Sequence, residues 1–99
     1  MSELTVKQRQ YLKGLAHGIQ PVVMIGNNGV TPSVIKEIQS SLNAHELIKI
    51  KVMSDDREVR EALIPQLLTE TAAQFVQHIG KQIILFKSSD KQKITLPKE

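Results

Sequence analysis

Residues 21–32 read PVVMIGNNGVTP, and this stretch decides the class of fold. Its first five residues form a short, continuously apolar run between helix-breaking sequences, which is typical of a strand buried on both faces. The glycine-bounded turn at residues 26–29 ends that strand. Thr31 can then cap a helix, and Pro32 suits its first position, where the missing N–H costs nothing. The stretch therefore predicts a strand, a tight turn and a capped helix that runs to about Asn43.

The next segment, residues 47–52 (LIKIKV), predicts a second strand. Its side chains alternate between two faces, one with Ile48, Ile50 and Val52 and the other with Leu47, Lys49 and Lys51. Two consecutive strands joined through a helix form a right-handed parallel unit. The pair of lysines further implies that one face of this strand is open, or at least reaches the rim of the sheet.

Upstream of this unit, the residues from Thr5 to about Ile19 predict a helix. Arg9, Lys13 and His17 follow one another at intervals of four, which stacks them in one basic, solvent-facing row. The adjoining apolar arc is expected to be buried and comprises Tyr11, Leu12, Leu15, Ala16 and Ile19.

Downstream, a third helix is expected from roughly Asp56 to Ala73, kinked or divided by Pro65. Its inward side should comprise Val59, Ala62, Leu63 and Leu67. Residues 74–79 and 82–86 then flank a Gly-Lys pair, which is the signature of an antiparallel hairpin with a type II′ turn.

The predicted element order is therefore α-β-α-β-α-β-β. This order defines the fold class as α/β, a single layered domain with a mixed four-stranded sheet and helices. Ninety-nine residues, 40% of them hydrophobic, suit one domain with a small core. We expect the core to span about residues 4–87 and the polar tail, residues 88–99, to be loosely ordered.

The composition argues against several classes of protein. Cysteine is absent, which excludes disulfides and thiolate chemistry. No apolar run approaches the roughly 20 residues of a membrane span, and no signal peptide is apparent at the N-terminus. These features predict a soluble cytoplasmic protein without a membrane partner, and a monomer by default.

The basic residues are unevenly distributed. The net charge is +3, from thirteen Lys and Arg against ten Asp and Glu. Residues 1–54 hold six basic and three acidic residues, whereas seven of each sign cancel in the remainder. The whole excess thus lies in the half that carries the glycine turn. With only three aromatic residues, a binding face built mainly on base stacking is not expected.

The glycine turn, Gly26-Asn27-Asn28-Gly29, is the first candidate site. Glycine permits close approach of a ligand, and the first amides of the following helix, aided by its dipole, suit a phosphate. The alternative is a simple tight turn, which these four residues alone favour. Arg9, Lys13, Lys49 and Lys51 are either its electrostatic companions on a nucleic-acid backbone or simply a solvated face.

The sequence does not indicate a metal, cofactor or catalytic site. His17, His45 and His78 come from separate segments in no metal-binding pattern. The Walker loop and the dinucleotide fingerprint are both missing. No pairing of a base with a nucleophile stands out, although a spatial triad has no fixed spacing. We therefore expect a protein that is not an enzyme and needs no cofactor.

The ordered set of motifs resembles the YhbY family, the stand-alone form of the CRM (chloroplast RNA splicing and ribosome maturation) domain. The resemblance runs from Leu4 to Lys87. The matching segments are LTxKQR at 4–9, LAH at 15–17, PV at 21–22, IGNNGVT at 25–31, HELIKIK at 45–51, QHIG at 77–80 and IILFK at 83–87.

The resemblance implies a non-catalytic RNA-binding domain similar in layout to the C-terminal domain of translation initiation factor three. It also implies an assembly factor that binds ribosomal RNA in precursors of the large ribosomal subunit. The RNA-binding residues expected by position are Gly26, Asn27, Asn28, Gly29 and Thr31, extended by Arg9, Lys13, Lys49 and Lys51. Family members commonly carry lysine where this chain has Asn27, so its loop lacks a cation of its own.

Two other functions stay open from the sequence. The first is a protein-interaction adaptor whose basic surface docks on an acidic protein or a ribosomal protein. The second is a small hydrolase that uses a histidine, and it requires a histidine, a hydroxyl and a carboxylate to converge in the fold.

Overall fold

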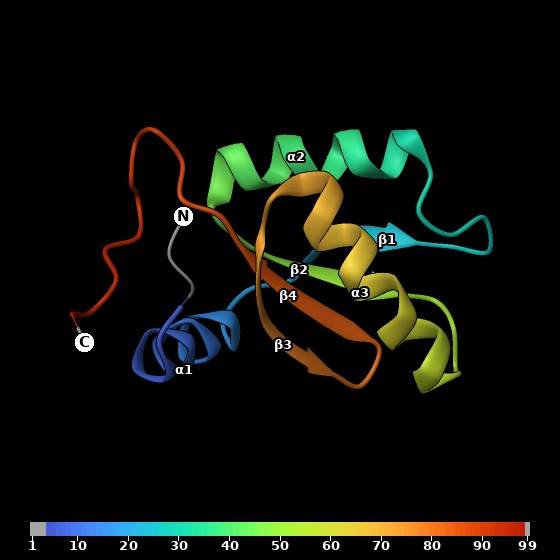
Figure 1. The fold of residues 1–99 in the computed structure, drawn as a ribbon, viewed down its shortest axis with the longest axis horizontal. Coiled ribbons are helices and arrows are strands. Elements are labelled where there is room, and N and C mark those ends of the chain that lie inside the picture. The colour runs from blue at the N-terminus through green and yellow to red at the C-terminus, as the bar shows by residue number, and fades with distance from the viewer. Residues whose placement is uncertain (1–3, 99) are drawn as a thin grey trace.

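The computed structural model describes residues 4–98 and contains the helices and strands in the expected order (Figure 1). The helices are α1 (Val6–Ala16), α2 (Pro32–His45) and α3 (Arg57–Thr71). The strands are β1 (Pro21–Ile25), β2 (Leu47–Val52), β3 (Gln74–Ile79) and β4 (Gln82–Phe86). In the described residues they form one four-stranded sheet with the order β1-β2-β4-β3. The predicted α/β fold class is confirmed.

The strand pairing also follows the prediction. β1 runs parallel to β2, while β4 is antiparallel to both β2 and β3, so the sheet is mixed. At the hairpin turn Gly80 has a φ of 56°, whereas Lys81 is not among the residues with positive φ. This pattern fits a type II′ turn, in which only the first central residue has positive φ.

Two hydrophobic clusters lie on opposite faces of the sheet. On one face, Ile48, Ile50 and Val52 of β2 pack with α2 and α3. On the other face, the side chains that pack with α1 include Leu47, Ile84 and Phe86. Alternation along β2 therefore assigns its aliphatic residues to the larger core and leaves Lys49 and Lys51 on the α1 side.

The expectation that β1 is buried on both faces is wrong. Val23 and Ile25 are buried against α2 and α3, but Val22 and Met24 are 43% and 63% exposed. β1 is an edge strand, and the short helix α1 packs against β2 and β3 instead of covering it. One face of β1 is consequently open to solvent.

Two helices differ from the prediction in detail. α1 ends at Ala16, and Tyr11 and Leu15 are exposed because the helix contacts the sheet through a narrower stripe centred on Leu12 and Ala16. In α3 the helix continues through Pro65, and Val59 and Ala62 are exposed rather than inward-facing.

The tail, which the sequence predicts to be loosely ordered, contacts the domain in the described residues up to 98. The tail contains no helix or strand, but the buried Glu46 carboxylate accepts hydrogen bonds from the N–H groups of Ser89 (2.8 Å) and Ile94 (2.7 Å). Ile94 and Leu96 pack against the cluster beneath α1. These contacts place the polar segment against the domain. No helix in residues 4–98 has the length and apolar character of a membrane span.

Candidate nucleic-acid interface

The glycine turn joins β1 to α2 at one end of the molecule, and α1 lies toward the other end (Figure 1). The N–H of Gly29 donates to the carbonyl oxygen of Gly26 at 3.0 Å and closes the turn. Gly29 has a φ of 70°, which favours glycine, whereas Gly26 does not have positive φ. A Cβ placed on Gly26 would meet no heavy atom within 4 Å. Gly29 therefore shapes the turn, and Gly26 leaves its backbone uncovered.

The backbone amides of the turn are available to a ligand. Asn27 and Asn28 are exposed, and within residues 4–98 their N–H groups donate no hydrogen bond. At the start of α2, Pro32 has no N–H, and the Thr31 hydroxyl accepts the N–H of Val34 at 3.2 Å. Thr31 thus serves as the helix cap, and the unpaired N–H groups before it point to an anion-binding turn.

The two lysines of β2 lie on the α1 side of the sheet and are half-buried. Lys51 is opposite Met24 of β1, which precedes the glycine turn by two residues, and Lys49 is opposite Ile84 of β4. α1 packs on Leu47 at the beginning of β2, and the residues at the end of α1 line a recess with Lys49 but not with Lys51. Of the cations predicted to bind RNA, Lys51 is therefore the one beside the turn, because it lies on the strand next to β1.

A recess between the end of α1 and the sheet brings Lys13 and Lys49 together. Its volume is about 180 Å³. We define it by its lining residues, which are Lys13, Ala16, His17, Lys49, Gln77, Ile79, Gln82 and Ile84. Lys13, Lys49 and Lys51 consequently form a line of cations that leads from α1 across β2 toward the glycine turn.

Arg9 lies elsewhere. Its Nε donates to the carbonyl oxygen of Phe75 in β3 at 3.3 Å. It lines a groove of about 690 Å³ together with Arg57 and Glu61 of α3. β3 and β1 are opposite edges of the sheet, so the structure separates Arg9 from the glycine turn. Lys13 lines both the groove that contains Arg9 and the recess that contains Lys49.

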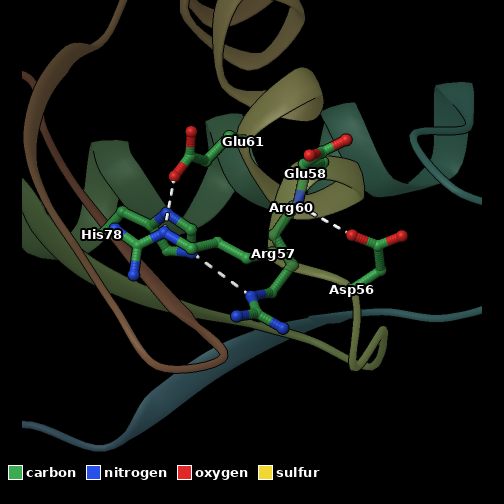
Figure 2. Close-up of polar contacts among 6 residues, drawn as sticks. All are labelled: Asp56, Arg57, Glu58, Arg60, Glu61 and His78. Atoms are coloured by element: carbon green, nitrogen blue, oxygen red, sulfur yellow. Dashed lines mark hydrogen bonds and ion pairs between the residues drawn. The ribbon is translucent and has the colours of Figure 1, made fainter.

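Figure 2 shows polar contacts at the start of α3, including the contact between Arg60 and His78 that joins α3 to β3. Arg60 is only 7% exposed; its Nη1 donates to the carbonyl of Ser54 at 2.8 Å and its Nε to His78 Nε2 at 3.3 Å. Sequence reasoning missed Arg60, yet it precedes the buried Leu67 by seven residues and so shares its helical stripe. Within residues 4–98 no histidine side chain bonds a hydroxyl or a carboxylate, so the contacts that a histidine hydrolase requires are not assembled.

Two carboxylates have lowered pKa values, and both serve the fold. Burial opposes ionisation of Glu46, but hydrogen bonds from the Ser89 side chain and from the backbones of Ser89, Ile94 and Lys93 hold its pKa at about 2, below the ordinary 4.5. A hydrogen bond and the charge of Lys81 lower the pKa of Asp55. These interactions anchor the tail and the β3–β4 hairpin respectively.

Together these features define a small α/β domain with an exposed Gly-x-x-Gly turn and a basic, partly uncovered sheet face. The model of the CRS1/YhbY (CRM) domain matches residues 4–87, and the chain belongs to this family. The family predicted from the sequence motifs is therefore confirmed.

Individual relatives agree with this assignment. The chain is 48% identical to an RNA-binding protein of Haemophilus influenzae over 99 residues, which is all of both chains. It is 38% identical over 95 residues to YqeI of Bacillus subtilis, named a probable RNA-binding protein, with 95% of this chain and 99% of that one covered. The solution structure of a hypothetical protein from Staphylococcus aureus, described as a candidate RNA-binding protein, matches with a TM-score of 0.83 and 37% identity, covering 95% of this chain and 99% of that chain.

Proposed function

We propose that this protein is a non-catalytic RNA-binding protein that holds an RNA backbone between its Gly-x-x-Gly turn and the lysines of its open sheet face. The proposal rests on one observation. Lys13, Lys49 and Lys51 form a line that ends beside a turn whose N–H groups are unpaired. The names of the relatives, which are RNA-binding proteins or candidates for that role, support the same conclusion.

The chemistry of the surface suits phosphate groups. N–H groups of the turn donate to phosphate oxygens, and the dipole of α2 adds partial positive charge at the same place. The lysines displace counterions from the backbone and orient the strand. Contacts of this kind position RNA without reading its sequence.

In the cell, we expect the RNA to be ribosomal RNA in precursors of the large ribosomal subunit, which the protein binds in the cytoplasm as an assembly factor. Crosslinking followed by sequencing of the bound RNA tests this role. Treatment of the isolated particle with ribonuclease distinguishes it from the adaptor alternative, because a protein held by RNA is released and an adaptor held by a ribosomal protein is retained.

The RNA contact is tested by measuring affinity for structured ribosomal RNA over a series of salt concentrations. Replacing both lysines of β2 (Lys49→Ala with Lys51→Ala) should flatten the slope of log affinity against log salt by roughly 1.4–1.8, because two phosphate contacts are lost. The matched control replaces two exposed lysines of the tail, Lys91→Ala with Lys98→Ala, and should keep the wild-type slope. Absent or salt-insensitive binding by the wild type would contradict the proposal.

A further inference from the structure

We propose that the recess between α1 and the sheet binds one unpaired base of the RNA, so that the protein recognises single-stranded rather than fully paired RNA at this point. The proposal rests on the proposed RNA-binding function and adds a base-binding subsite to the phosphate-binding surface. The recess was defined above by the eight residues that line it.

The size and the floor of the recess fit one flat heterocycle. Its volume of about 180 Å³ is smaller than the roughly 300–1,000 Å³ of sites for drug-sized ligands. Its floor includes Ile84 and Ala16, which are almost fully buried, and the exposed Ile79 stands at the rim. Apolar side chains of this kind pack against the face of a base, whereas they offer nothing to a phosphate.

The walls of the recess supply hydrogen-bonding groups that the protein leaves unused. Gln77 lies opposite Ile84 and Gln82 lies opposite Ile79, and both glutamines are half-buried. Within residues 4–98 neither side-chain amide makes a hydrogen bond to another group. Each amide offers two donor hydrogens and an acceptor oxygen, which complement the mixed donors and acceptors of a base edge.

Gln77 reaches the recess because of an irregularity in β3. The pairing of β3 with β4 shifts register between Phe75 and Gln77. As a result the consecutive residues Val76 and Gln77 both face α1, Val76 in the hydrophobic cluster and Gln77 in the recess. Bulges re-aim side chains in this way, often beside binding sites.

The surroundings place the recess on the path of a nucleic-acid strand. His17 at the end of α1 is exposed and offers an aromatic ring for stacking. Lys13 and Lys49 flank the recess, and among residues 4–98 no acidic side chain lines it. Lys51 continues the same face toward the glycine turn. A strand whose phosphates follow these lysines can insert a base between them, whereas a base in a duplex is already paired and stacked.

The experiment compares two RNA probes of about 12 nucleotides with the same backbone, one carrying bases and one abasic. The wild type should bind the base-bearing strand about tenfold more tightly than the abasic strand. Replacing both amides (Gln77→Ala with Gln82→Ala) should remove this difference and leave affinity for the abasic strand unchanged. Gln10→Ala with Gln20→Ala, which removes two exposed amides outside the recess, should retain the difference.

A spectroscopic measurement on the wild type keeps the test independent of the stability of the variants. The side-chain amide resonances of Gln77 and Gln82 in ¹⁵N-labelled protein should shift with the base-bearing strand and not with the abasic strand. Equal affinity for both probes, or an equal loss for both in the glutamine variant, overturns the base subsite while leaving the phosphate surface intact. Failure to bind either probe overturns the base subsite, and the RNA-binding function falls with it only if structured ribosomal RNA also fails to bind.

Discussion

At the glycine turn, two glycines of one motif have different physical roles. Gly29 has a φ of 70°, where an L side chain is strained, and it therefore determines the shape of the turn. Gly26 adopts no such conformation and faces open space, so the fold does not require it to be glycine. Close approach of a ligand to the backbone would be a separate reason for a residue without a side chain at position 26.

The pair of variants Gly26→Ala and Gly29→Ala separates these roles. Gly26→Ala should leave the free energy of unfolding within about 0.5 kcal/mol of the wild type, yet lower RNA affinity, because the added methyl group blocks the phosphate. Gly29→Ala should lower the free energy of unfolding by about 1 kcal/mol, because alanine is strained at positive φ. Urea unfolding and filter binding measure the two quantities. Unchanged affinity in Gly26→Ala would remove the turn from the binding surface.

Glu46 is the second residue whose role is clear from its contacts. Its side chain is fully buried, and its carboxylate is the acceptor that holds Ser89 and Ile94 of the tail. The folded-state pKa of about 2 lies below the ordinary 4.5, so the ionised form stabilises the fold above pH 4.5. That stabilisation is lost as the pH falls from about 4.5 toward 2, because the proton then competes with the hydrogen bonds.

Glu46→Gln should lower the free energy of unfolding at pH 7 by about 2 kcal/mol, because a neutral amide is a weaker acceptor for the N–H groups of the tail. Between pH 4.5 and 2, the free energy of unfolding of the variant should also fall less than that of the wild type. Urea unfolding at a series of pH values checks both effects. Parallel pH profiles for the two proteins would show that Glu46 is not the group responsible.

At the level of elements, the tail is a covering segment rather than a free end. Its apolar residues Ile94 and Leu96 pack on the cluster formed by α1 and the sheet, and the carbonyl of Pro97 accepts a hydrogen bond from Gln8 in α1 at 3.1 Å. The two apolar residues are separated by one exposed threonine. This short alternation of apolar and polar residues indicates a segment with one buried side, although the segment as a whole is polar in composition.

Ile94→Ala with Leu96→Ala should lower the free energy of unfolding by roughly 2 kcal/mol, because two half-buried side chains lose most of their apolar contact area. Thr95→Ala changes an exposed residue of the same segment and should have no measurable effect. Thermal or urea unfolding distinguishes the two variants. If they were equally stable, the tail would not contribute to the core.

At the level of the whole molecule, the sheet order divides the predicted cations into two groups. Lys13, Lys49 and Lys51 share the face that leads to the glycine turn. Arg9 bonds the backbone of β3, the edge opposite to β1, where its guanidinium ties α1 to the sheet. Spacing along a helix placed Arg9 and Lys13 in one row, but only the packing of that helix shows which surface each residue faces.

Arg9→Ala and Lys51→Ala should therefore have opposite consequences. Arg9→Ala should lower the free energy of unfolding by about 1 kcal/mol, because it loses a hydrogen bond and the packing of its stem, and change RNA affinity less than about twofold. Lys51→Ala should retain stability and flatten the salt slope by about 0.7–0.9. A salt slope that changes as much in Arg9→Ala as in Lys51→Ala would extend the RNA surface to the β3 edge.

Local patterns in the sequence predicted the element order, the bounds of all four strands, and the capped turn between β1 and α2, because these depend on alternation, capping and backbone freedom within a few residues. The motifs also determined the family. Tertiary structure alone decided which faces stay open. The packing of the short helix α1 against β2 and β3 exposes one face of β1 and separates Arg9 from the turn, whereas the contacts of α3 with Ser54 and His78 bury Arg60. Such outcomes depend on contacts between distant elements, which no local pattern contains.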